Sequence, residues 1–199
     1  MISFILEKYF GGINMRGISS VTKIVAKIFE IGHWVGAAIM TAASICVKAA
    51  PEWAGCFVGL DAKGCCGARL VVYGFEVCAP MTEGGVDMTV CMLFGIGAVI
   101  IFVLMAMMFR NLYLIFRNSE NASPFQADNM RMLKEIGIFS IAVPAVGMII
   151  GAVIRLAAGP DAAEVSINLS GILMGIIVLC LTQYFIRGIE LEKDMEGLV

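Results

Sequence analysis

The stretch MTVCMLFGIGAVIIFVLMAMMF, residues 88–109, decides the fold class because it contains no charged side chain. A helix needs about 20 mostly apolar residues to cross the roughly 30 Å of hydrocarbon in a bilayer. This stretch therefore predicts a membrane-spanning helix. The following residues, NLYLIF, continue the helical pattern, so we place this helix at 88–116.

Three other segments have the same apolar character. They predict helices at residues 24–47, 133–156 and 165–188. Pro144 lies inside the segment 133–156 and predicts a kink near Ser140. We therefore expect an all-α integral membrane protein in which residues 1–199 form one four-transmembrane-helix bundle.

The composition supports a lipid environment and excludes some functions. Hydrophobic residues make up 60% of the 199 residues and charged residues 15%, whereas a soluble domain has about 45–50% and about 25%. A net charge of −2 gives no basic surface for direct binding of nucleic acid.

The orientation follows from where lysine and arginine lie, because positive residues near spans stay on the cytoplasmic side. The N-terminal stretch and the connection 117–132, with the helix ends beside it, hold most of them: Lys8, Arg16, Lys23, Lys27, Arg110, Arg117, Arg131 and Lys134. We therefore predict a plasma-membrane protein with its N-terminus, its C-terminus and the tail 189–199 in the cytoplasm. The loop 48–87 is then extracellular.

This outer loop is the one sizeable stretch with strand character. The runs CFVGL and ARLVVYGFEVC are rich in β-formers and are separated by the glycine-bearing DAKGCCG. The pattern predicts a small β-hairpin whose turn lies in DAKGCCG.

The outer loop also holds four of the seven cysteines: Cys56, Cys65, Cys66 and Cys78. Disulfides persist outside the cell, and a bond between adjacent cysteines is strained. We therefore expect Cys56 to pair with Cys65 or Cys66, and Cys78 to pair with the other one. Structural zinc sites usually contain CxxC-like pairs, which this loop does not have, so we predict no metal and no cofactor.

Polar side chains collect near the predicted cytoplasmic ends of the helices. They include Glu30, His33, Asn111, Gln183 and Arg187. Ionisable residues inside a span are candidates for function, because a charge at the bilayer centre costs on the order of 3 kcal/mol. If the helix ends converge, these groups line a cytoplasm-facing polar pocket. The simpler interpretation is that each of them meets water or a neighbouring residue at the membrane interface.

Glycine pairs four residues apart predict close helix contacts. The pairs are Gly32 with Gly36, Gly147 with Gly151, and Gly171 with Gly175. We interpret them first as contacts within the bundle and second as the face of a homodimer.

Two motifs resemble a known family. SPFQADNMRMLKEIGIFSI leads a polar turn into a span, and RGIELEKDMEGLV leads the last span into an acidic tail. In this order they resemble the bacterial membrane-protein family catalogued as domain of unknown function 2975, from Arg110 to Val199. The first half of the chain matches the family only in its plan of helices. The resemblance implies four spans, no established catalytic residues, and frequent encoding beside a short helix-turn-helix protein.

Both motifs face the cytoplasm in the predicted topology. Pro124, Phe125, Asp128 and Asn129 are expected to cap a helix that starts near Met130. The acidic tail carries Glu190, Glu192, Asp194 and Glu196. A helix cap and a charge-balanced tail explain most of this pattern, and the alternative is a docking surface for a cytosolic helix-turn-helix partner.

Three classes of function compete. A membrane-embedded regulator or sensor ranks first because of the cytoplasmic motifs. A small transporter or channel ranks second, since the spans lack charged midplane residues. A membrane thiol-redox enzyme ranks last because the sequence shows no nucleophile or acid–base constellation, so we expect a protein that is not an enzyme.

Overall fold

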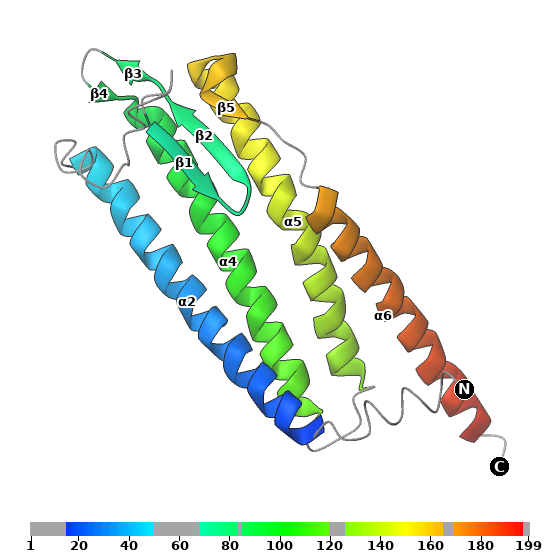
Figure 1. Cartoon of the computed structure of the whole chain (residues 1–199). Coiled ribbons are helices and arrows are strands. Elements are labelled where there is room, and N and C mark those ends of the chain that lie inside the picture. Colours follow the sequence, from blue (N-terminus) through cyan, green and yellow to red (C-terminus); the bar gives the residue numbers. More distant parts are fainter. Residues whose placement is uncertain (1–14, 50–67, 83–84, 120–125, 165–168, 197–199) are drawn as a thin grey trace, which may run out of the picture.

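Four long helices form most of the molecule (Figure 1). The computed structural model describes residues 15–49, 68–82, 85–119, 126–164 and 169–196. The helices are α2 (Met15–Ala49), α4 (Met88–Asn118), α5 (Ala127–Ala158) and α6 (Leu169–Glu196). Each contains a stretch that is long and apolar enough to cross a membrane. The predicted number and order of apolar helices are confirmed.

The helices extend beyond their predicted bounds at several ends. α2 begins at Met15 rather than near residue 24, and α6 continues to Glu196, through most of the predicted tail. The prediction relied on apolar residues, but a helix continues into water where its polar residues still form backbone hydrogen bonds. α5 is unbroken from Ala127 to Ala158, with Pro144 inside it.

The predicted cap of the third span is wrong. α5 begins at Ala127, and its N-cap residue is Gln126, whose side chain makes no capping hydrogen bond. Asp128 and Asn129 therefore lie in the first turn of the helix rather than before it. α4 has a true side-chain cap, because the Asp87 carboxylate accepts hydrogen bonds from the backbone N–H groups of Thr89 and Val90.

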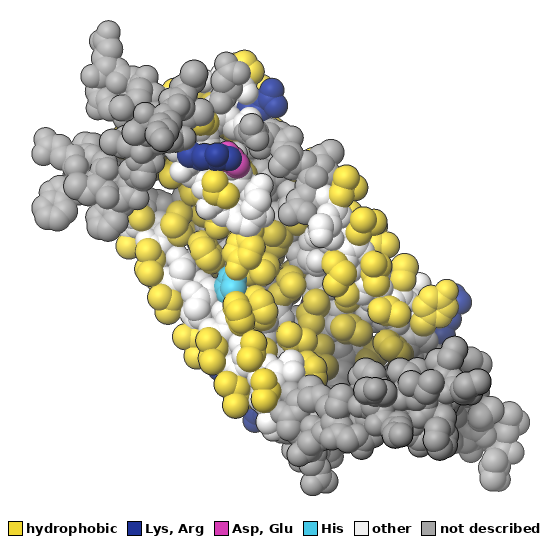
Figure 2. All heavy atoms as spheres, in the orientation of Figure 1, with side chains coloured by type: hydrophobic (Ala, Val, Ile, Leu, Met, Phe, Trp, Pro, Cys, Tyr) yellow, Lys and Arg dark blue, Asp and Glu magenta, His cyan; other side chains and the backbone are white. Residues whose placement is uncertain are grey.

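Consecutive helices lie side by side in a row. The most extensive helix contacts join α2 to α4, α4 to α5 and α5 to α6, and Figure 1 shows the four helices in this order across the molecule. The row leaves large apolar side chains exposed along α2 and α6, as expected where lipid would cover them. Figure 2 shows hydrophobic side chains over the length of the helices.

Glycines set the contact between α5 and α6. A Cβ atom on Gly175 would lie 2.7 Å from the backbone oxygen of Gly137, and one on Gly171 would lie 3.3 Å from that of Ser140. Ser140 also donates a hydrogen bond from Oγ to the Gly171 oxygen, at 3.1 Å. The predicted pair Gly171 and Gly175 thus packs within the chain, whereas nothing lies within 4 Å of a Cβ on Gly32.

The strands form two small antiparallel sheets. One has the order β1 (Ala68–Val72), β2 (Phe75–Ala79), β5 (Ala163–Glu164), and the other pairs β3 (Met81–Thr82) with β4 (Gly85–Val86). A short 3₁₀ helix, η1 (Pro160–Ala162), precedes β5. The strand β5 comes from the third connection, so two connections that are far apart in the sequence share one sheet.

A hairpin is present, but the predicted position of its turn is wrong. The chain reverses at Tyr73 and Gly74, inside the run ARLVVYGFEVC that was predicted to be one strand. Both turn residues have positive φ, 48° and 79°, which is the backbone of a two-residue type I′ turn. The YG dipeptide between alternating residues was the overlooked signal. CFVGL lies outside the described residues.

The hairpin of β1 and β2 packs onto the helices and completes the core. Phe75, Val77 and Ala79 are buried against α4 and α5. Phe75 stacks on Phe94 with ring centroids 5.3 Å apart, and it fills the space left by Gly97 of α4 and Gly147 of α5. The hairpin therefore lies along the helices in Figure 1 rather than beyond their ends.

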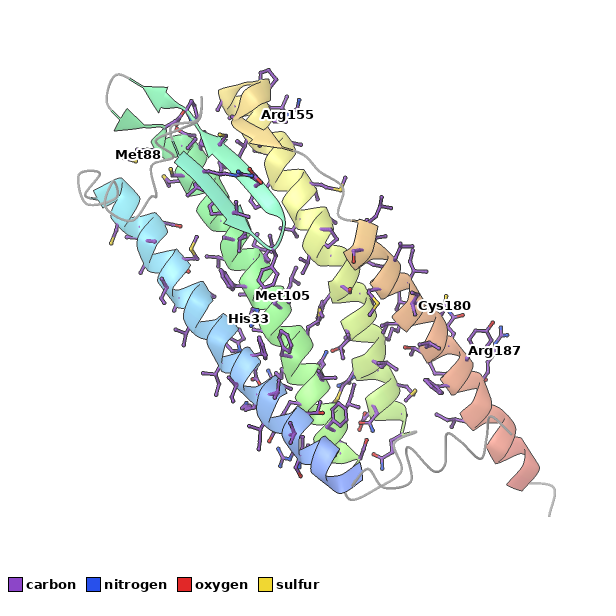
Figure 3. All side chains as sticks on the ribbon, viewed as in Figure 1. His33, Met88, Met105, Arg155, Cys180 and Arg187 are labelled. Atoms are coloured by element: carbon purple, nitrogen blue, oxygen red, sulfur yellow. The ribbon has the colours of Figure 1, made fainter. Side chains whose placement is uncertain are left out.

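The two ends of the helix row differ in charge. We call the end where α2 and α5 begin and α4 and α6 finish the basic end, because it carries Lys23, Lys27, Arg110, Arg117, Arg131, Lys134 and Arg187. We call the other end, which carries the sheets and η1, the hairpin end. Figure 3 labels Arg155 there.

Candidate functional site

His33 lies near the middle of α2 and not, as predicted, near its cytoplasmic end. The apolar stretch of α2 runs from Ser19 to Cys46, so His33 is about equally far from both limits. Its side chain is buried, with 5% of its surface exposed. Figure 3 shows His33 halfway along the helix. The only histidine of the chain is therefore placed in the middle of an apolar stretch, where burying a polar group is costly unless it is hydrogen-bonded.

Both ring nitrogens of His33 have partners. Nδ1 lies 2.6 Å from the Phe29 backbone oxygen one turn earlier, and Nε2 bonds to the Tyr73 hydroxyl at the tip of the hairpin. A carbonyl oxygen can only accept, so Nδ1 carries the hydrogen. In the neutral ring Nε2 then accepts the hydrogen of the Tyr73 hydroxyl. Burial raises the pKa of the Tyr73 phenol, which keeps this donor protonated.

Aromatic rings enclose this polar contact. The His33 ring centroid is 5.1 Å from that of Phe109 and 5.9 Å from that of Phe102, both on α4. Phe102 also meets the Tyr73 ring edge-on at 6.1 Å. We call His33, Tyr73, Phe29, Phe102 and Phe109 the histidine cluster. It joins α2, α4 and the hairpin, and among the described residues it is where the hairpin tip reaches the middle of the apolar stretch of α2.

One turn towards the basic end, an ion pair accompanies the histidine cluster. Lys27 Nζ lies 2.9 Å from Glu30 Oε2, and the Glu30 side chain is nearly buried. The same ammonium group lies 5.1 Å from the centroid of the Tyr113 ring on α4. The Glu30 carboxylate is therefore neutralised within α2, as a buried carboxylate needs to be.

The predicted polar pocket is not assembled as one site. Asn111 is buried between α4 and α5 and donates to Glu135 Oε2 at 2.8 Å, away from His33. Gln183 and Arg187 are exposed on α6, and Figure 3 shows Arg187 at the other side of the helix row from His33. The sequence predicted that these residues lie at similar positions along their helices. It could not predict that the helices form a row, which keeps the residues apart.

The predicted docking residues do not form one surface either. Asp128 is exposed in the first turn of α5, whereas Asn129 is fully buried. The Asn129 amide accepts from Asn118 and donates to Ser119, both near the end of α4. Asn129 therefore joins α5 to α4, and its buried side chain is not part of the protein surface. Pro124 and Phe125 lie outside the described residues.

The acidic tail residues belong to α6. Glu190 is exposed on this helix, and the helix backbone continues through the positions of Glu192, Asp194 and Glu196. The predicted tail is therefore a helical extension up to Glu196 rather than a separate segment.

The cysteines fall into two groups. Cys46, Cys91 and Cys180 are free thiols on the helices, of which Cys91 is buried and the other two are exposed. Cys78 lies on β2 and is not among these free thiols. Its predicted partners, Cys56, Cys65 and Cys66, lie outside the described residues. Among the described residues no three histidine, cysteine or acidic side chains gather to hold a metal ion.

Residues 34–199 match the family described as Protein of unknown function (DUF2975). The chain belongs to this family. The match confirms the resemblance and extends it upstream of Arg110 to the hairpin and to the part of α2 that follows His33. Tyr73 therefore lies within the match, whereas His33 and Phe29 lie just before it. No curated protein and no solved structure matches the chain with significance.

Proposed function

We propose that this DUF2975 protein is a multi-pass membrane regulator that transmits a change at its outer hairpin to its cytoplasmic surface. The observation that carries the proposal is the bond between Tyr73 and His33. It links a hairpin at one end of the helices to the middle of α2. A signal that moves or releases the hairpin thereby acts on a helix that continues to the opposite end.

The path from the histidine cluster to the basic end is short. Phe29 stacks on Phe109 with centroids 5.0 Å apart, and Lys27 reaches Tyr113. Both contacts join α2 to α4 on the turns that follow His33 towards the basic end. A shift of α2 relative to α4 would therefore change the surface formed by the ends of these helices.

The proposed topology places the basic end and both termini in the cytoplasm of the cell. The concentration of lysine and arginine at this end supports it. The proposed partner is a cytosolic helix-turn-helix regulator, which the family resemblance suggests. Exposed Asp128 and Glu190, with Glu192, Asp194 and Glu196 further along α6, supply the acidic charge to hold its basic surface.

A disulfide at the hairpin end is part of the proposal. Cys78 lies on β2 opposite Arg69 of β1, so a bond from Cys78 to Cys65 or Cys66 would tie the base of the hairpin to the chain that precedes it. Such a bond would fix β2 to the chain that precedes β1 and would persist in an oxidising compartment.

Affinity purification in mild detergent tests the function. We expect the full chain to retain a cytosolic protein partner and a chain lacking residues 190–199 to lose at least about 90% of it, since rim charges steer and hold such partners. The matched control is Arg155→Gln at the hairpin end, which should retain the partner fully.

The other outcomes decide between functions. Equal recovery of a partner with and without residues 190–199 contradicts docking at the acidic tail. Recovery of a bound small molecule and no protein would instead support a transporter or channel, and recovery of a quinone would support a thiol-redox enzyme.

A further inference from the structure

The two faces of the hairpin have opposite chemistry. The face towards the helices presents Phe75, Val77 and Ala79, all buried. The other face presents Arg69 and Glu76, which form an ion pair across the two strands, and Val71, which is 57% exposed. A hairpin that is apolar on one side and charged on the other is typical of a boundary between a protein core and water.

This charged face lies beside the apolar part of the helices. The tip of the hairpin bonds to His33, midway along the apolar stretch of α2. The five residues of β1 extend over roughly 17 Å at about 3.3 Å per residue. This length is about half of the roughly 30 Å hydrocarbon thickness, so the hairpin runs from the hairpin end to the middle of the span.

Lipid cannot cover such a hairpin without a large penalty. An ion pair in hydrocarbon is expensive, and strand backbone at membrane depth is tolerated only inside protein or beside water. In an antiparallel hairpin only every second residue pair exchanges backbone hydrogen bonds, beginning with the pair that flanks the two-residue turn. Here those pairs are Val72 with Phe75 and Leu70 with Val77. The N–H and C=O groups of Val71 then point to the other edge of β1, where no described strand pairs with it.

We infer that the outer face of the hairpin lines a water-filled cleft open at the hairpin end, and that His33 is a proton-binding site reached through it. The inference rests on the proposed function and names its signal, the proton concentration outside the cell. The partly exposed Tyr73 stands between this water and the buried imidazole.

Proton binding would reverse one hydrogen bond. In the neutral state Nδ1–H donates to the Phe29 oxygen, and Tyr73 donates to Nε2. When Nε2 takes a proton from water, it becomes a donor, so the Tyr73 oxygen must accept and its own hydrogen must turn to another acceptor. Water in the cleft supplies both the proton and that acceptor. The imidazolium would lie beside the rings of Phe102 and Phe109, whose centroids are 5.9 and 5.1 Å from that of His33.

Few other titratable groups can influence this step. The hairpin contributes Tyr73, with Arg69 and Glu76 paired to each other further up. α2 contributes Glu30 one turn away, already paired with Lys27, and the rings that α4 directs at His33 are phenylalanines. Among the described residues packed around His33, the charged side chains are therefore already paired with one another.

The single histidine makes the site directly observable. We would label the full-length protein with ¹⁵N-histidine, purify it through a histidine-free tag and record the ring nitrogen signals in lipid nanodiscs between about pH 4 and pH 8. We expect the Nδ1–H tautomer at high pH and conversion to imidazolium on acidification. A ring that keeps the neutral tautomer over the whole range would overturn the proposal.

Two tyrosine variants test the coupling. Tyr73→Phe removes the hydroxyl that would change from donor to acceptor when Nε2 takes a proton. We expect the titration midpoint of His33 to move by about half a pH unit or more in this variant. Tyr113→Phe is the matched control, because Tyr113 meets Lys27 rather than His33, and it should leave the midpoint unchanged. Equal midpoints in both variants would exclude Tyr73 from the site.

Thiol labelling in intact cells tests the cleft. We would compare Val71→Cys with Leu173→Cys, since these positions are 57% and 55% exposed on the hairpin and on the apolar surface of α6. After the labelling of the parent chain is subtracted, a membrane-impermeant thiol reagent should label Val71→Cys at least about tenfold faster than Leu173→Cys. The reagent travels only in water, which we expect at the hairpin and not at the lipid-covered surface of α6. Equal rates would refute an outward-open cleft. None of these three experiments uses the cytosolic partner, so a failed partner purification would leave their results standing.

Discussion

The contacts at the two sides of the helix row, between α5 and α6 and between α2 and α4, are made by different kinds of groups. α5 and α6 approach through glycine, so that the Gly137 oxygen lies only 2.7 Å from where a Cβ of Gly175 would be. α2 and α4 approach through large rings around Lys27, Glu30 and His33. Nearer the hairpin end they also meet at Gly95, where a Cβ would clash with the Ser44 hydroxyl oxygen. The first contact is made by backbone that cannot move without moving a helix. The second is made by side chains that can rotate, which makes α2 and α4 the better pair to transmit a change.

The largest effect is expected at the glycine contact. In Gly175→Ala the new methyl group would lie 2.5 Å from Ile141 Cγ1 and 2.7 Å from the Gly137 oxygen, so α6 must shift. We expect a loss of about 1–3 kcal/mol in the free energy of unfolding, measured by reversible denaturation in mixed micelles. Gly188→Ala, on the same helix with nothing within 4 Å, should be neutral or stabilising. Equal losses in the two variants would contradict a rigid α5–α6 contact.

The same substitution at the ring contact should have a smaller effect. In Gly36→Ala the methyl group would lie 2.9 Å from Phe102 Cε1, but a phenylalanine ring can turn away. We expect a loss below about 1 kcal/mol, together with altered ring signals of Phe102 and His33 in NMR spectra. If Gly36→Ala destabilises the protein as much as Gly175→Ala, then α2 and α4 are held as rigidly as α5 and α6, and the comparison fails.

The fold was predictable where one residue type dominates a long segment. Residues 88–109 identified α4 at once, and the pair Gly171 and Gly175 was correctly interpreted as a contact within the chain. The hairpin turn was missed because DAKGCCG holds more glycine than YG does. The dipeptide forms the turn because Tyr73 accepts a positive φ, a strain that its bond to His33 and its ring contacts offset.

The histidine cluster was less predictable than the helices. His33 was correctly singled out as an unusual residue, but its position in depth depends on where α2 begins, and its partner comes from a loop 40 residues away. No spacing rule links Tyr73 to His33. The predicted inner pocket failed for a related reason, since the helices lie in a row and place Arg187 far from α2.

The smallest effect is expected from the hydroxyl that joins α5 to α6. Ser140 donates to the Gly171 oxygen on the neighbouring helix at 3.1 Å, whereas Thr41 donates to Ala37 within its own helix. Hydrogen bonds between helices in membranes contribute about 0.6 kcal/mol on average. Ser140→Ala should therefore lower the free energy of unfolding by about this amount, and Thr41→Val should leave it nearly unchanged.

A double variant of Ser140→Ala with Gly175→Ala sharpens the test, because the Ser140 hydroxyl can contribute only while α5 and α6 are in contact. The effect of Ser140→Ala should thus shrink once Gly175 is replaced, and full additivity would show that the bond survives a shift of α6.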